Sequence, residues 1–181
     1  MPKKAIVTLP NNTLRHKAEE VRAEDIASAG IQRLISDMKE ILAKAPDGVG
    51  LAAPQVGAGL RIFLVSEEAA VIGSQREKRE ALDSERKRKV WKYFVFINPV
   101  LKKQSRSKIK MAEGCLSVPG KFGEIGRSEK VFLAWRDEAG KKHERGFTKF
   151  FARVIQHETD HLDGTLIVDR AKRIFEMANS K

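Results

Sequence analysis

The sequence has 181 residues, of which 41% are hydrophobic, and this is enough for one globular domain over residues 1–181. Its longest uncharged run, residues 48–60, is too short to span a bilayer, and its first residues are not those of a secretory signal. We therefore expect a soluble, cytoplasmic protein without a membrane partner. The net charge of +11 favours anionic partners, above all nucleic acid, and a single cysteine excludes an internal disulfide.

The first predicted element is a helix over residues 31–42, where apolar side chains recur every three or four positions. A strand is predicted over residues 60–65, "LRIFLV". Residues 67–92 read as a charged insertion, because 76–92 hold eight basic and four acidic residues. We interpret the insertion as a solvated, helical or loose segment, and a dedicated RNA-binding surface is the alternative.

Further strands are predicted where β-branched and aromatic residues gather, at 93–101, 108–114 and 130–135. The basic run 102–110 has five basic residues and no acid. A turn at 137–140 leads into one more strand near 141–147, and a second helix covers about 148–161. A short basic helix over 169–181 is expected to finish the chain.

The segment "VIQHETDHLDG" carries two histidines four residues apart, His157 and His161. On a helix these positions share one face, so both imidazoles can bind one cation. Glu158 points beside such a cation, which suits a base acting on water. The alternative is an ordinary helix whose two histidines are satisfied by neighbours, and the pattern alone does not separate the two.

A catalytic metal site needs a third protein ligand, and Cys115 in "EGCLSVPG" is the candidate. Free cysteine is also common as a small buried hydrophobe. A cysteine–histidine pair can instead serve a nucleophilic hydrolase, but that chemistry needs one histidine as base and not two at ligand spacing.

A third stretch, "GVGLAAPQVG" at 48–57, has small residues that let a chain run close to another group, and it ends near the amide of Gln55. Together, "GVGLAAPQ", "EGCLS" and "QHETDHLDG" resemble the three signature motifs of the peptide deformylase family, complete and in that family's order. The resemblance also covers "VTLPNNTLRHKAEEV", "VFINPVL", "VFLAWRDEAG" and "GTLIVDR". It therefore spans most of the chain except 67–92 and the last residues.

The resemblance implies an α+β fold with antiparallel sheets packed around the helix that carries "HETDH". It implies metal-dependent removal of the formyl group from the N-terminal formylmethionine of new polypeptides. Cys115, His157 and His161 would hold one divalent ion, most often Fe²⁺, with Zn²⁺, Ni²⁺ or Co²⁺ after purification. Glu158 would be the general base and later the proton donor to the departing amine.

The same resemblance assigns stabilisation of the developing oxyanion to the Gln55 side chain and the Leu116 backbone N–H. It implies that the substrate chain pairs with the backbone of Gly50. The substrate-binding candidates are Val49, Gly50, Leu51, Phe150 and Val154. The charge suggests a second partner, the RNA of the ribosome surface, contacted through the basic runs.

The sequence departs from the family pattern at Lys149, where a glycine is expected before "FFARVIQHE". It also lacks the arginine that some members have soon after the proline of "EGCLSVP". Two other functions stay open at this point. One is a zinc endopeptidase, whose third ligand is normally a downstream histidine or glutamate, and the other is a non-catalytic protein that associates with the ribosome or RNA.

Overall fold

The structure, a computed structural model, describes residues 5–45, 48–72 and 91–176. Its strands form two antiparallel sheets, one with the order β1-β2-β3-β6-β7 and one with the order β4-β5-β8. The strands are β1 Gly50–Ala52, β2 Ile62–Ser66, β3 Tyr93–Gln104, β4 Lys108–Cys115, β5 Val118–Ser128, β6 Lys130–Arg136, β7 Lys142–Thr148 and β8 Ile174–Glu176. The α-helices are α1 Ala29–Lys44, α2 Glu68–Ile72, α4 Lys149–Leu162 and α5 Ile167–Arg170, and the 3₁₀ helices are η1 Asn12–Arg15, η2 Ala23–Asp25 and η3 Ala53–Val56.

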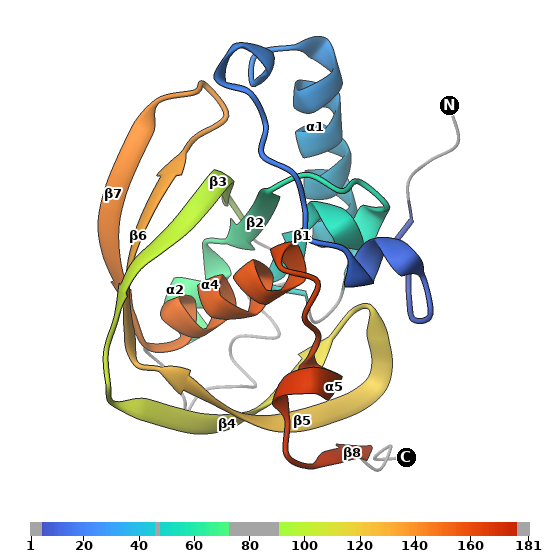
Figure 1. Ribbon diagram of the computed structural model, residues 1–181, viewed down its shortest axis with the longest axis vertical. Coiled ribbons are helices and arrows are strands. Elements are labelled where there is room, and N and C mark those ends of the chain that lie inside the picture. The colour runs from blue at the N-terminus through green and yellow to red at the C-terminus, as the bar shows by residue number, and fades with distance from the viewer. Residues whose placement is uncertain (1–4, 46–47, 73–90, 177–181) are drawn as a thin grey trace.

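Helix α4 lies in the middle of the molecule, with β4 and β5 below it and β1 to β3 beside it in the view of Figure 1. Helix α1 packs on the opposite face of the five-stranded sheet. This arrangement confirms the expected α+β fold, in which antiparallel sheets surround the helix that carries "HETDH". None of the helices within the described residues is long and apolar enough to cross a membrane.

Strand β2 shows why the sheet sits between two helices. Ile62 and Leu64 face α1, whereas Phe63 and Val65 face α4, and all four side chains are fully buried. A strand that is covered on both faces reads as a continuous apolar run, since neither set of alternate side chains meets water. The apolar run "IFLV" at 62–65, within the predicted strand, therefore encodes a central strand.

The two longer predicted helices and the strands at 60–65, 93–101, 108–114, 130–135 and 141–147 are confirmed, with ends that shift by up to a few residues. Sequence reasoning missed β1, β5 and β8. Strand β5 has glycines at 120, 123 and 126, which weaken a strand signal. The strand is stabilised instead by its pairing with β4, which runs from Lys108 opposite Ser128 to Gly114 opposite Phe122.

The predicted basic helix over 169–181 is wrong in its described part. Helix α5 ends at Arg170, the next residue has an extended backbone, and Ile174–Glu176 forms strand β8. This strand pairs with the free edge of β5, placing Phe175 opposite Phe122. The open edge of a sheet thus decides the conformation, because it offers backbone partners that a short helix there would leave unused. Residues 177–181 lie outside the described residues.

The segment 67–92, interpreted as a solvated, helical or loose charged insertion, is helical but not solvated where the structure describes its start. Helix α2 occupies Glu68–Ile72 and contacts α4, and both Glu68 and Ala69 are buried. The interpretation of residues 73–90 falls outside the described residues.

Lys149, the residue found in place of an expected glycine, is the first residue of α4 and has a φ of 57°. This left-handed conformation costs a residue with a Cβ about 1–2 kcal/mol, whereas glycine adopts it freely. The chain needs this geometry to turn sharply from β7 into α4, and the Lys149 N–H donates to the Glu129 carbonyl at 3.0 Å. The helix therefore begins at the expected place, with local strain at its first residue.

Candidate metal centre

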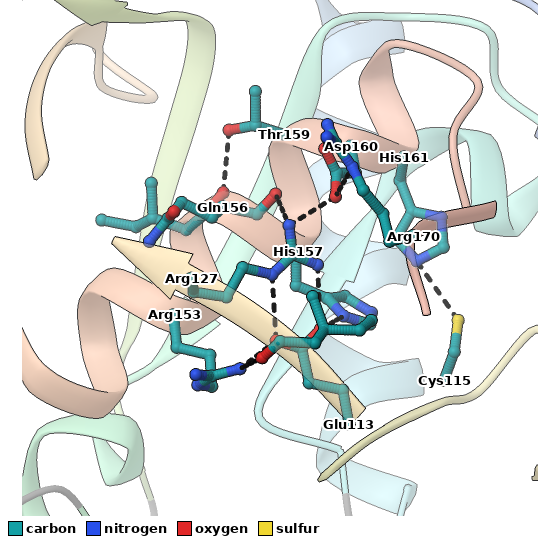
Figure 2. Close-up of polar contacts among 12 residues, drawn as sticks. Glu113, Cys115, Arg127, Arg153, Gln156, His157, Thr159, Asp160, His161 and Arg170 are labelled. Atoms are coloured by element: carbon teal, nitrogen blue, oxygen red, sulfur yellow. Dashed lines mark hydrogen bonds and ion pairs between the residues drawn. The ribbon is translucent and has the colours of Figure 1, made fainter. Parts of the chain in front are cut away.

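Helix α4 and the end of β4 bring three metal-binding side chains together. His157 and His161 lie one turn apart on α4, and Cys115 is the last residue of β4. The potential donor atoms of the three residues all lie within 4.8 Å of one another. The Cys115 Sγ is 3.2 Å from His161 Nε2, as Figure 2 shows. The predicted ligand set therefore converges on one point.

The donor set fits a divalent transition metal. One thiolate and two imidazoles are ligands of a catalytic site that keeps a position open for water or substrate. The Nδ1 of His157 lies 3.0 Å from a carboxylate oxygen of Glu113, so Nδ1 carries the proton and Nε2 is left with its lone pair for a metal. Among the described residues, the buried His161 Nδ1 and Glu158 Oε2 have no hydrogen-bond partner. An unpartnered buried carboxylate oxygen, that of Glu158, is typical of a site that is completed by another group, whereas the His161 Nδ1 lies on the other side of its ring from Cys115.

Glu158 follows His157 and is only 3% exposed. Burial raises the pKa of its carboxyl group to about 7. A carboxyl group with that pKa can take a proton from water and return it near neutral pH, as a general base and acid must. The predicted base thus lies beside the three ligands in an environment that suits proton transfer.

Gly50 explains why the family motif "GVGLAAPQ" has a glycine at this point. A Cβ built on Gly50 would lie 2.3 Å from Glu158 Oε1 and 2.9 Å from Val154 Cγ1. Both contacts are closer than real Cβ atoms show, so any side chain at position 50 would displace the carboxylate. The backbone of β1 therefore lies directly against Glu158.

Gln55, in η3, reaches the same centre and is 2% exposed. Its Oε1 accepts from the Ala52 N–H at 2.8 Å, and its Nε2 donates to Ser117 Oγ at 3.2 Å. The same Nε2 lies 3.8 Å from Cys115 Sγ. The accepted hydrogen bond fixes which end of the amide faces the metal ligands, so an N–H donor points toward the reaction site. Leu116, the second predicted donor, follows Cys115 directly and is partly buried.

The five predicted substrate-binding residues do not all face the centre. Gly50 lies against both Glu158 and Val154, while Val49 and Phe150 are partly buried at the margin of the cluster around α4. Leu51 is fully buried in the other cluster, on the α1 side of the sheet. Alternation along β1 turns its side chain away from Glu158, and the assignment of Leu51 to substrate binding stays a prediction that its backbone alone would carry.

Glu113 is a site residue that sequence reasoning missed, although it stands in "EGCLS". It is 7% exposed and accepts two hydrogen bonds from Arg127, at 2.9 and 2.8 Å, besides contacts with Arg153 and His157. Burial would raise the pKa of Glu113, but hydrogen bonds from His157 and Arg127 lower it far below its usual range. Glu113 therefore stays ionised and holds the His157 ring by its Nδ1–H.

Asp160, three residues after His157, is a second carboxylate that sequence reasoning missed. Its Oδ2 accepts from Arg127, and both of its oxygens accept from Arg170 (Figure 2). Gln156 fixes the same helix turn, because its side-chain amide accepts a hydrogen bond from the Ser128 N–H and donates one to the Ser128 carbonyl. Polar residues of α4 thus have partners on β4, β5 and α5.

A local signal existed for Glu113 and none for Arg127. Residues two apart on a strand face the same side, so an acid two positions before Cys115 is a candidate neighbour of the metal ligands. Arg127 stands twelve residues after Cys115, and its position next to Glu113 depends on the register of β4 with β5. Only the folded sheet shows that partner.

Comparison with known proteins shows the family of the chain. The sequence model of the family described as "Polypeptide deformylase" matches residues 3–176. The chain is 42% identical over 165 residues to peptide deformylase 1A, chloroplastic/mitochondrial, of Arabidopsis thaliana, covering 91% of this chain and 60% of that protein. It is 41% identical over 171 residues to a peptide deformylase of Chlorobaculum parvum, covering 91% of this chain and 80% of the relative.

Solved structures give the same result. A Met-Ala-Ser-bound class I type b peptide deformylase from Acinetobacter baumannii is similar with a TM-score of 0.76 and 30% identity, covering 92% of this chain and 97% of that one. An actinonin complex of a peptide deformylase from Synechococcus elongatus is similar with a TM-score of 0.75 and 30% identity, covering 96% and 81%. Neither the endopeptidase nor the non-catalytic alternative finds support among these relatives.

Proposed function

Because the chain belongs to the polypeptide deformylase family, we propose that it hydrolyses the N-terminal formyl group from formylmethionine of newly made polypeptides. The products are formate and a polypeptide with a free amino terminus. The observation that carries this proposal is the convergence of Cys115, His157 and His161 beside the buried carboxyl group of Glu158 and the amide of Gln55.

Cys115, His157 and His161 would hold one divalent metal ion. When bound, the ion supplies Lewis-acid polarisation of water and of the formyl oxygen. Glu158 takes the proton from the attacking water and carries it to the amine that leaves. Its buried position and its raised pKa, about 7, make both transfers possible near neutral pH. The Gln55 amide and the Leu116 backbone N–H donate hydrogen bonds to the oxyanion that forms on the formyl group.

The substrate peptide would add to the edge of β1. This strand is the end strand of the five-stranded sheet, so the backbone of Gly50 is placed to pair with an extended peptide. Such pairing sets the formyl group against Glu158, which lies next to Gly50. The methionine side chain would enter the apolar surroundings of Val49, Phe150 and Val154.

The direct test is formate release from formyl-Met-Ala-Ser by anaerobically prepared protein, with metal analysis of the same sample. We expect formate in proportion to bound metal and no cleavage of a matched peptide that offers only internal amides. Cleavage of the internal amide would indicate an endopeptidase. A metal-loaded sample that releases no formate would overturn the proposed activity.

We propose ferrous iron as the ion in the cell, with Zn²⁺, Ni²⁺ or Co²⁺ able to replace it, since one sulfur and two nitrogen ligands suit all four. A ferrous site with a thiolate ligand is open to oxidation in air. We therefore expect the nickel-loaded protein to lose activity more slowly in air than the ferrous protein. Equal rates of loss would contradict the role of iron in that sensitivity. A cytoplasmic location also stays a prediction.

We also propose that the basic run 102–110 draws the protein to ribosomal RNA, where its substrate emerges. The run connects β3 with β4, and its lysines and Arg106 are exposed. Replacing Lys102 and Lys103 by glutamate should weaken co-sedimentation with ribosomes at low salt and spare turnover of a short peptide. The matched control reverses Arg33 and Lys44, which are exposed on α1. Equal binding by both double variants would show that the run is not the contact.

A further inference from the structure

Arg170, the last residue of α5, lies at the outer end of a series of ionic contacts that reaches a metal ligand. We propose that it is a positioning residue, which holds His157 in its metal-binding orientation through Asp160, Arg127 and Glu113. The inference rests on the metal site of the proposed function and adds a residue outside the three family motifs. Figure 2 shows the series, from Arg170 at one end to His157.

The first contact joins two helices. Arg170 Nη2 donates to Asp160 Oδ1 at 2.6 Å, and its Nε donates to Asp160 Oδ2 at 3.1 Å. This is a two-pronged pair, which fixes both the position and the plane of the carboxylate. Among the described residues, no group other than Arg170 donates to Oδ1. Asp160 is 7% exposed, so water does not readily take the place of the guanidinium.

The middle of the series is a buried arginine. Arg127 Nη1 donates to Asp160 Oδ2, and its Nε and Nη2 donate to the two oxygens of Glu113 at 2.9 and 2.8 Å. One guanidinium therefore bridges the two carboxylates in its plane. Because the fork is rigid, a shift of Asp160 changes where Arg127 can meet Glu113.

The last contact reaches the ligand. Glu113 Oε2 lies 3.0 Å from His157 Nδ1 and accepts a hydrogen bond from its N–H, which leaves Nε2 to face Cys115 and His161. A carboxylate in this place sets the ring orientation and the tautomer of a metal-binding histidine, and the loss of such a partner costs about 10–100-fold in metal affinity or activity. Arg170 acts further away, so we expect a smaller effect of about 3–10-fold.

The exposure of Arg170 separates positioning from simple stabilisation. Its side chain is 52% exposed, and such partly exposed ion pairs contribute little to folding stability. A second ion pair anchors the same helix without touching Asp160, between Arg15 Nη1 and Asp169 Oδ2. If Arg170 only fastened α5, then loss of Arg15 would act on the metal site in the same way.

The test uses Co²⁺-loaded protein and measures the rate at which a chelator removes the ion, together with the visible absorption of the bound cobalt. Arg170→Gln should speed removal about 3–10-fold and alter the spectrum, because the ligand geometry changes. Arg170→Lys should restore the slow release of cobalt only in part, since the ammonium group of lysine lacks the two-pronged fork of arginine. Arg15→Gln, the matched control, should leave both readouts as in the wild type.

Two outcomes would overturn the proposal while the proposed function stands. In one, Arg170→Gln releases cobalt at the wild-type rate while the wild type is active. In the other, Arg15→Gln speeds release as much as Arg170→Gln, which would assign the effect to anchoring of α5. A wild-type protein that binds no Co²⁺ would overturn both the positioning role and the metal site itself.

Discussion

Helices α1 and α4 have 16 and 14 residues and similar amphipathic sequences, yet they are buried in different ways. Helix α1 buries one apolar stripe, Leu34, Ile35, Met38 and Leu42, and leaves its charged face to water. Helix α4 buries residues all round, including Arg153, Gln156, Glu158, Asp160 and His161. The polar residues of α4 therefore do not mark a solvent-facing side.

The difference follows from where each helix lies. Helix α1 covers one face of the five-stranded sheet, whereas α4 is enclosed between that sheet and the strands β4 and β5. Buried polar groups are tolerated when hydrogen bonds or opposite charges satisfy them. Arg127 and Glu113 supply those partners for α4. Within α4, all of which the structure describes, the buried side-chain atoms left without partners are on Glu158 and His161, two residues of the proposed metal centre.

The largest effect should come from removing a ligand on the enclosed side. Cys115→Ser or His157→Ala should lose most of the bound metal and, with it, the activity, because three ligands hold the ion. Metal analysis and formate release on the same sample check this. A variant with full metal occupancy would show that the ligand assignment is wrong.

Glu158→Gln keeps the size of the side chain and removes its charge. We expect the metal to stay bound and turnover to fall by at least about 10²-fold, the low end for loss of general acid–base catalysis. Steady-state rates at equal metal content give the measurement. Near-normal turnover would remove Glu158 from the mechanism.

Met38→Ala tests the other helix, since the Met38 side chain is fully buried in the α1 cluster. Truncation in a packed core should lower the free energy of unfolding by about 2–5 kcal/mol. Activity per folded, metal-loaded molecule should not change, because Met38 lies on α1, on the opposite face of the five-stranded sheet from α4. Glu40→Ala, on the exposed face, is the control and should alter stability by less than about 0.5 kcal/mol. A large loss of turnover in folded Met38→Ala would contradict this division of roles.

Lys149→Gly should have the smallest effect, a gain in stability of up to about 1 kcal/mol. Glycine relieves the positive φ at the first residue of α4, although it also makes the unfolded chain more flexible. Lys149→Ala removes the same side chain but keeps the unfavourable backbone, so it should show no gain. Denaturant unfolding of the two variants separates them, and equal stabilities would show that the backbone conformation is not the cause.

The sequence alone determined the features that depend on local spacing. The apolar periodicity of residues 31–42 encodes α1, and the four-residue spacing of His157 and His161 places both imidazoles on one face of a helix. The three family motifs then predicted Cys115 as the third ligand and Gln55 as an oxyanion donor, and the structure brings Cys115 close to both Gln55 and His161. These features follow from helix geometry and from motifs that were complete in the chain.

The tertiary structure alone decided which distant groups meet. Arg127 reaches Glu113 and Asp160 through the register of β4 with β5, and no spacing in the sequence encodes that register. The open edge of β5 turned residues 174–176 into a strand, and alternation along β1 turned Leu51 away from the site. Contacts between residues far apart in the chain depend on how sheets align, because backbone pairing and shared burial act only once folding has brought those residues together.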